Sequence, residues 1–424
     1  MTRRAFFPGW KVVIGSGIGI SFGSIIFFAA SFALLASAWA REFGWTQIEL
    51  AKAASIFLLI QTAMCPVCGW LLDRWGSRKF AVASIAFFAA SLMLLSRIGN
   101  SLTQMYLGIA LVSLVSAGTN VVSYARAITL WFDRKRGMAL GLAASFQALG
   151  SFLLPLVSQK IIAQSGWSVA LLSLAAFELL VCLPLVALLV KDSPTPYGLL
   201  PDGAEPAEKV ATAKPVVAGM EVRDIMRTGS FWKLVVCFAI MGMSFYAITP
   251  NIVFILTKTA GLSLADVAKV LAISGVAVLF GRIGFGYLLD KLHAPIVGII
   301  VLALSTTCYV IYATTKVPAL IFAAAAIGGV AIGGDTDFMP YMASRYFGTR
   351  AVSKVFGWFL AAFFIGATVG PVVFARAMTA YNGAVTPLMA LAALQIVPAV
   401  LFLSLGRYPA EPEFTIGAAA VPSH

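Results

Sequence analysis

The sequence has few charged residues, cysteines and histidines for a chain of 424 residues. Only 11% of the residues are charged, where about 25% is usual in soluble domains. A water-soluble globule could not cover its core with so few polar side chains, so that class is excluded. The five cysteines are too few and too scattered for a disulfide framework, and the 60% hydrophobic content excludes intrinsic disorder. The composition indicates a membrane protein.

Motifs for soluble chemistry are also missing. The sequence contains no phosphate-binding loop, zinc-ligand spacing, nucleophilic serine motif or nucleotide-binding domain. We therefore expect no enzyme activity, no cofactor and no metal site, and no ATP-driven pumping. The formal net charge of +13 reflects membrane topology in our interpretation, and we expect no nucleic-acid partner.

Continuous apolar runs without strand-like alternation predict transmembrane helices, each of about 20 residues. The sequence thus predicts an all-α membrane protein with twelve transmembrane helices, arranged in two pseudo-symmetric six-helix bundles. The predicted spans are 11–36, 50–72, 80–96, 103–129, 138–162, 168–190, 231–256, 266–289, 296–314, 318–344, 352–378 and 385–406.

The distribution of lysine and arginine predicts the orientation. Basic residues are retained on the cytoplasmic side, and the runs 74–79 and 134–136 lie there if both termini are inside. We therefore predict a multi-pass protein of the cell membrane, bacterial inner or plasma, with both termini in the cytoplasm and membrane lipid around its spans.

Residues 191–230 interrupt the apolar pattern with five prolines and mixed charges. They predict a cytoplasmic linker between an N-terminal bundle, 1–190, and a C-terminal bundle, 231–408, which a tail of residues 409–424 follows. Alternating charged and apolar residues over 221–233 predict a short amphipathic helix on the membrane surface.

An internal repeat supports this division into halves. At a spacing of 217 or 216 residues the two halves match at several glycines and at one aspartate, one threonine, one tyrosine and one proline. The matched pairs are Gly44/Gly261, Gly69/Gly286, Asp73/Asp290, Thr119/Thr336, Tyr124/Tyr341, Gly141/Gly357, Gly150/Gly366 and Pro155/Pro371. Parallel six-helix repeats predict a substrate site at the midplane between the halves.

Two sets of motifs carry a family resemblance. Gly69-x-x-x-Asp73-Arg74-x-Gly76-Ser77-Arg78-Lys79, repeated more weakly from Gly286 to Lys291, resembles the loop signature of the major facilitator superfamily. The resemblance implies a conformational latch made by Gly69, Asp73, Arg74 and Asp290. The alternative is a basic signal that only retains the loop in the cytoplasm.

The second set of motifs is narrower. It consists of Pro8–Val13, Trp131-Phe132-x-x-x-Arg136-x-x-Ala139-x-Gly141 and Gly333-Gly334-Asp335-Thr336-Asp337 through Gly348. Together these resemble the branch of monocarboxylate transporters and oxalate–formate antiporters. The resemblance implies a carrier of organic carboxylates.

Few ionisable residues lie inside the predicted spans, and such residues are functional candidates because each costs about 2.5–3.5 kcal/mol to insert. Arg282 precedes the loop residue Asp290 by eight positions, which places it about 12 Å deep. Its planar guanidinium suits a carboxylate, and the family resemblance implies the same role. Glu178 lies on a peripheral span, where we expect only a packing hydrogen bond.

Three uncharged residues are predicted to complete the substrate site. Asn120 and Tyr124 share a helix face, as do Asp337 and Tyr341, and the repeat places these pairs opposite one another. We expect Arg282 to bind the anion while Asn120, Tyr124 and Tyr341 donate hydrogen bonds.

Asp337, or else Asp335, is the predicted proton carrier. With two acids against Arg282, one carboxylate lacks a cationic partner, so proton binding becomes favourable. His293 and His424 both lie outside the spans. The alternatives are an internal salt bridge from Arg282 to one of the acids, or a carboxylate that caps backbone amides.

The sequence thus predicts a secondary active transporter of a small organic monocarboxylate, working by alternating access with a proton as co-substrate. The alternative is an organic anion/anion antiporter of the oxalate–formate kind, and a drug exporter ranks lower. A single chain is expected to be the functional unit.

Overall fold

The computed structural model describes residues 7–203, 220–248, 251–252, 255–259, 261–334 and 338–408, and its regular elements there are helices. The N-terminal half contains α1 (Gly9–Phe22), α2 (Ser24–Phe43), α3 (Gln47–Trp75), α4 (Ser77–Leu95), α5 (Leu102–Ser116), the 3-10 helix η1 (Ala117–Thr119), α6 (Val121–Trp131), α7 (Arg136–Ser145), α8 (Gln147–Phe177), the π-helix η2 (Glu178–Cys182) and α9 (Leu183–Leu189). The linker carries η3 (Thr195–Tyr197), η4 (Pro201–Gly203) and α10 (Val222–Ile225). The C-terminal half contains α11 (Gly229–Ile248), the π-helix η6 (Ile255–Thr259), α13 (Leu264–Lys291), α14 (Ala294–Thr314), α15 (Pro318–Gly333), α16 (Phe338–Phe347), α17 (Val352–Ala380), α18 (Val385–Leu394) and α19 (Ile396–Leu403).

The described helices account for the predicted twelve spans. Ten helical runs are long and apolar enough to cross a membrane, and α15 with α16, bent by 40°, form an eleventh. The run Arg136–Leu189 has 54 residues, about 80 Å at 1.5 Å per residue, far more than a core of about 30 Å needs. Gly166, at φ 84°, interrupts it, so this run has the length of two predicted spans with a break between them.

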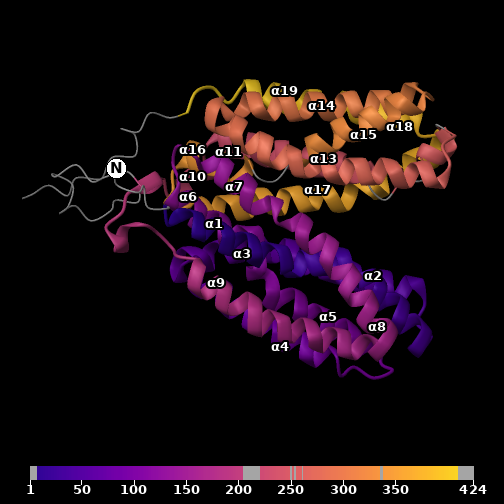
Figure 1. Ribbon diagram of the computed structural model, residues 1–424. Helices are drawn as coiled ribbons and strands as arrows, with labels where there is room; N and C mark the ends of the chain where they lie inside the picture. Colours follow the sequence, from indigo (N-terminus) through magenta and orange to yellow (C-terminus); the bar gives the residue numbers. More distant parts are fainter. Residues whose placement is uncertain are drawn as a thin grey trace, which may run out of the picture.

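The helices form two bundles that meet at one end (Figure 1). The bundle of the N-terminal half and that of the C-terminal half converge where α1, α6, α7 and α16 lie, and they diverge toward α2, α8 and α18. We call the converging end, which carries Asp73, Asp133 and Asp290, the closed end.

Glycines bring the two bundles into backbone contact. Gly69 and Gly357 place α17 against α3, while Gly137, Gly141 and Gly286 place α13 against α7. A Cβ added at any of the five would overlap backbone atoms of the facing helix. Small residues permit such close approach in membranes, where dispersion contacts rather than hydrophobic burial hold helices together.

Two spans of the N-terminal half that the sequence predicts as continuous are each broken at an extended residue. Gly23 is extended (φ −61°, ψ 166°) and separates α1 from α2 within the predicted span 11–36. The 3-10 turn η1 and the extended Asn120 (φ −79°, ψ 165°) separate α5 from α6 within 103–129. Continuous helices were the wrong prediction there, because apolar composition does not show where a helix interrupts its own hydrogen bonds.

The linker helix is shorter than predicted. Instead of a helix over 221–233, the structure has the single turn α10, and α11 begins at Gly229. Thr228 explains the boundary, because its hydroxyl accepts a hydrogen bond of 3.3 Å from the backbone N–H of Phe231 and so caps α11. Residues 204–219 and the tail 409–424 lie outside the described residues.

Gly366 tests the glycine packing inside the C-terminal half. A Cβ there would overlap the backbone of α11 at Ala239, so Gly366→Leu must push α17 from α11. We expect the free energy of unfolding to fall by about 3 kcal/mol and the thermal denaturation midpoint to fall by about 5–10 °C. The matched control is Gly275→Leu, because no atom lies within 4 Å of a Cβ at Gly275. Equal midpoints for the two variants would contradict this packing argument.

Candidate functional site

The two helix breaks of the N-terminal half lie side by side. The backbone N–H of Ser24, at the start of α2, donates to the hydroxyl of Thr119 at 3.0 Å. That hydroxyl donates in turn to the carbonyl of Ser116 at 2.8 Å. Each break thus satisfies polar groups of the other, which hydrocarbon requires of any backbone that leaves the helical pattern.

Gln61 of α3 forms hydrogen bonds with residues at both breaks. Its amide nitrogen donates to Ser24 Oγ at 3.0 Å and to the carbonyl of Ser113 at 3.2 Å. Its amide oxygen accepts from Asn120 Nδ2 at 2.7 Å. Gln61 and Asn120 are both buried, so these hydrogen bonds hold the break between η1 and α6 in place.

A cavity of about 110 Å³ lies between the halves, beside these two breaks. The N-terminal half contributes the two breaks and Gln147, and the C-terminal half contributes Arg282 and apolar side chains. The lining residues are Ile20, Gly23, Ile25, Ile26, Thr119, Asn120, Val121, Gln147, Tyr246, Arg282, Ile332, Leu360 and Phe364. We call this the central cavity, and it lies between the halves, where the repeat predicts a site.

Arg282 is the charged residue of this wall. It is half-buried on α13, and its Nη2 donates to Gln147 Oε1 at 3.2 Å, across the two halves. Gly141 of α7 and Gly333 of α15 both face its backbone at contact distance. This packing holds the guanidinium-bearing turn of α13 at the interface of the halves.

The N-terminal ends of two helices add to the positive potential that Arg282 creates in the cavity. Ile25 and Ile26 in the first turn of α2, and Val121 in the first turn of α6, line the same cavity as Arg282. The first turn of a helix has N–H groups without helical partners and acts as a partial positive charge. No Asp or Glu lies among the described lining residues, so the described part of the cavity wall is electropositive.

The sequence-predicted substrate residues separate in this conformation. Arg282 and Asn120 both line the central cavity. Tyr124 is fully buried inside the N-terminal half, where Gly19 of α1 leaves room for its hydroxyl. Tyr341 lies near the closed end, with the guanidinium of Arg345 5.3 Å from its ring centroid. Neither tyrosine is among the described residues that line the central cavity, and their contact with substrate stays a prediction.

The predicted proton carriers Asp335 and Asp337 lie outside the described residues, and so does any ion pair between them and Arg282. Glu178 is described, and it is fully buried in the π-helix η2 beside Cys182.

The four predicted latch residues lie at the closed end. Three of them, Asp290, Asp73 and Gly69, contact the opposite half. The carboxylate of Asp290 accepts from the backbone N–H groups of Gly137 at 2.7 Å and Met138 at 2.9 Å, and so caps α7 of the other half. Asp73 lies 3.4 Å from Arg126 in its own half and 3.7 Å from Lys354 across the interface.

The other two predicted latch residues differ in their surroundings. Gly69 contacts the first turn of α17, at Ser353. Arg74 stays within its own half, with its guanidinium 5.7 Å from the ring centroid of Trp70.

Two further ties at the closed end are absent from the sequence predictions. Arg136 donates to Ser344 Oγ at 2.8 Å, and Arg345 pairs with Asp133 at 3.1 Å. Three of these four residues, Arg136, Ser344 and Arg345, stand in the motifs that resemble the monocarboxylate branch. The motifs could have pointed to these residues, but only the fold shows that the residues meet across the interface.

Comparison with known proteins identifies the family. The model of the Major Facilitator Superfamily matches residues 17–371, most of the chain. The chain belongs to the major facilitator superfamily. Its relatives are membrane transporters rather than enzymes, and this major facilitator is a multi-pass membrane transporter.

Relatives of known name match at low identity. An MFS transporter of Aspergillus flavus, asaE, is 26% identical over 75% of this chain and 68% of its own length. Bovine monocarboxylate transporter 13 is 26% identical over 69% of this chain and 64% of its own length. A probable sulfoacetate transporter of Cupriavidus necator is 31% identical over 36% of this chain and 35% of its own.

Solved structures show the same fold. The human organic anion transporter MFSD10 matches with a TM-score of 0.63 and 14% identity, covering 93% of this chain and 99% of that one. The Escherichia coli fucose:proton symporter matches with a TM-score of 0.62 and 14% identity, covering 94% and 100%.

Asp290→Asn tests the contact that caps α7 across the interface. The amide keeps one acceptor atom but loses the charge, and hydrogen bonds to charged groups contribute about 1.5–3 kcal/mol. The distance between spin labels at Lys135 and Arg350, one on each half, measures whether the closed end has separated. We expect the population with the longer distance to be about tenfold larger in the variant than in the wild type.

The control for this experiment is Asp266→Asn, which removes an exposed carboxylate at the opposite end of the same helix, α13. Identical distance distributions in the two variants would show that the Asp290 contact does not hold the closed end together.

Proposed function

We propose that this transporter is a secondary active carrier of a small organic monocarboxylate anion. The observation that carries the proposal is the convergence of Arg282 with the first turns of α2 and α6 on one cavity between the halves. A guanidinium can form two parallel charge-assisted bonds with a carboxylate, and helix N-termini add backbone donors. The names of its relatives, among them a monocarboxylate transporter and a probable sulfoacetate transporter, support an anionic substrate.

The proposed mechanism is alternating access. In this structure the halves meet at the closed end, through glycine contacts and the Asp290 cap of α7, while they diverge at the other end. Rocking the halves about the central cavity would break these contacts and open the closed end to release the anion. With the predicted topology, the closed end faces the cytoplasm and this conformation is open to the outside of the cell membrane.

A single chain forms both walls of the central cavity. We therefore propose one chain as the functional unit, with no nucleic-acid partner and no cofactor in the transport cycle. We propose proton symport as the coupling mode, with Asp337 as the carrier and Asp335 as the second candidate, because both stand in the sequence near the cavity residue Ile332.

Arg282→Ala tests the anion site. Loss of a bidentate, charge-assisted contact of about 3 kcal/mol should raise the KM for uptake of a radiolabelled monocarboxylate into proteoliposomes about 100-fold. Arg282→Lys should recover part of the affinity, because it keeps the charge without the planar fork. Arg376→Ala, an exposed arginine of α17, is the control and should transport normally. An unchanged KM in a well-folded Arg282→Ala protein would end the anion proposal.

Asp337→Asn tests the coupling. Because the amide cannot bind a proton, we expect uptake in proteoliposomes to lose its dependence on an imposed pH gradient, while Asp335→Asn keeps it. Proton entry with the anion should acidify the vesicle interior, and a trapped pH-sensitive dye follows this internal acidification during uptake. Wild-type flux that ignores the pH gradient and requires an internal counter-anion would replace symport by anion exchange.

A further inference from the structure

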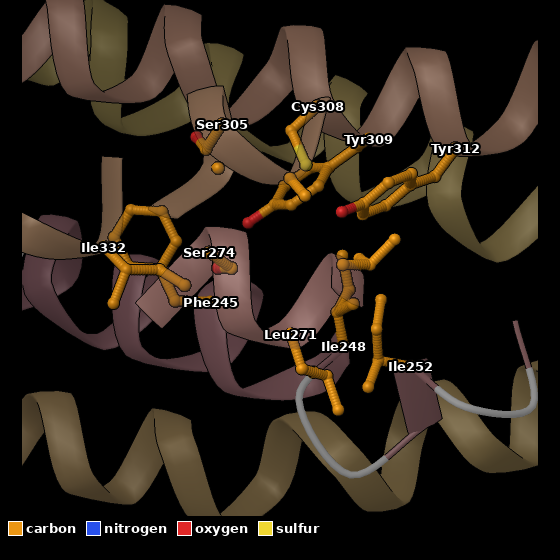
Figure 2. A pocket seen from close by; sticks show the side chains of 13 residues that line it. Phe245, Ile248, Ile252, Leu271, Ser274, Ser305, Cys308, Tyr309, Tyr312 and Ile332 are labelled. Carbon is orange, nitrogen blue, oxygen red and sulfur yellow. The ribbon is translucent and has the colours of Figure 1, made fainter. Parts of the chain in front are cut away.

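A second cavity, of about 140 Å³, lies within the C-terminal half between α11, α13, α14 and α15 (Figure 2). Most of its wall is apolar, with Phe245, Ile248 and Val270 all nearly buried. Polar groups reach it from two helices, at Ser274 on α13 and at Tyr309 on α14. A mainly apolar space with a few placed polar groups is the usual form of a small-molecule site. We call it the C-terminal cavity.

Tyr309 is the unusual member of this wall. It is 4% exposed, and its hydroxyl has no hydrogen-bond partner within 3.5 Å in the described part of the chain, although Ser305, one turn earlier on α14, lies close enough to interact with it. Figure 2 shows Tyr309 and Tyr312 reaching from α14 into the space above Ser274. Buried hydroxyls are paired in nearly all proteins, so the Tyr309 hydroxyl lies where a ligand atom would satisfy it.

The C-terminal cavity adjoins the central cavity. Ile332 lines both, and the consecutive residues Phe245 and Tyr246 line one each. Along α13, Ser274 and Arg282 are eight residues apart, which is about 12 Å of helix. The two cavities therefore share part of their wall, and a ligand that passes Ile332 would reach from Arg282 into the C-terminal cavity.

We propose that the C-terminal cavity receives the body of the transported anion, and that the substrate class is an elongated aryl carboxylic acid with a hydrogen-bonding group at the far end of its ring. The carboxylate lies at Arg282, the ring lies beside Phe245 and Ile332, and the distal group bonds to the hydroxyl of Tyr309. This assignment rests on the proposed function, because it takes Arg282 as the anion site.

The geometry favours this occupant over a shorter acid or a lipid chain. A two- or three-carbon acid at Arg282 would leave the C-terminal cavity and the Tyr309 hydroxyl unused. A lipid acyl chain has no polar atom at its end to pair with that hydroxyl. An aryl acid with a distal hydroxyl uses the charge, the apolar wall and the buried donor together.

Binding of four probes to the purified full-length protein by titration calorimetry tests the assignment. The probes are propionate, cinnamate, 4-hydroxycinnamate and the neutral cinnamamide. We expect 4-hydroxycinnamate to bind at least about tenfold more tightly than propionate, because it adds buried apolar area and a hydrogen bond. Cinnamamide should bind far more weakly than cinnamate, because it lacks the charge that Arg282 needs.

Two variants of the C-terminal cavity locate the ring and the distal group. Ser274→Leu places an apolar side chain in the cavity, and it should remove the preference for cinnamates while propionate affinity stays within about twofold. Tyr309→Phe should weaken 4-hydroxycinnamate about three- to tenfold and leave cinnamate unchanged, because only the hydroxyl is lost.

Matched controls are available elsewhere in the chain. Ser173→Leu makes the same change in an apolar cavity of the N-terminal half, and Tyr381→Phe removes an exposed hydroxyl. Neither should alter the affinity of any probe. These controls separate the loss of a subsite from a general loss of stability.

The outcomes distinguish this inference from the proposed function. If Arg282→Ala abolishes binding of every acid but Ser274→Leu and Tyr309→Phe change nothing, the anion site stands and the C-terminal cavity is overturned as its subsite. If Arg282→Ala leaves all affinities unchanged, the proposed function itself fails. Equal affinity of the wild type for propionate and 4-hydroxycinnamate would also overturn the subsite.

Discussion

Backbone amides inside a bilayer have no water to bond with, and this constraint shapes the N-terminal half of the site. The chain leaves helical geometry at Gly23 and at Asn120, and both departures are stabilised by one group of polar side chains around Gln61. Each departure begins a new helix, and residues from the first turns of both helices line the central cavity. The partial positive charges of these two helix ends add to the charge of Arg282 in the described part of the wall.

The contact between the halves depends on short-range packing that can be undone. Glycines bring α3 against α17 and α7 against α13, and the acid Asp290 caps a helix of the opposite half instead of a neighbour in its own. Such contacts are strong when the backbones touch and disappear when the helices separate by a few ångströms. This suits an interface with two discrete arrangements better than a permanent core.

Much of the fold could be predicted from the sequence, because hydropathy and the internal repeat report length and order directly. The position of Asp290 at a helix end could also be predicted, since a motif places it there, and its role as a latch stays a prediction. Depth along a helix predicts a position inside the span for Asn120 and Arg282, which both line the central cavity, but it does not give the direction of a side chain around the helix axis. Tyr124 therefore turned out to lie inside its own bundle. The breaks at Gly23 and Asn120 depend on tertiary partners that no local pattern shows.

One helix carries both the guanidinium of Arg282 and the carboxylate of Asp290, two turns apart on α13. The first group bonds to Gln147 and the second caps α7, so both of these bonds reach the same opposite half. A shift of α13 relative to that half therefore changes the two bonds together. By thermodynamic reciprocity, any occupant of the cavity that favours one position of α13 must alter the strength of the cap, and the cap must alter the affinity for that occupant by the same factor.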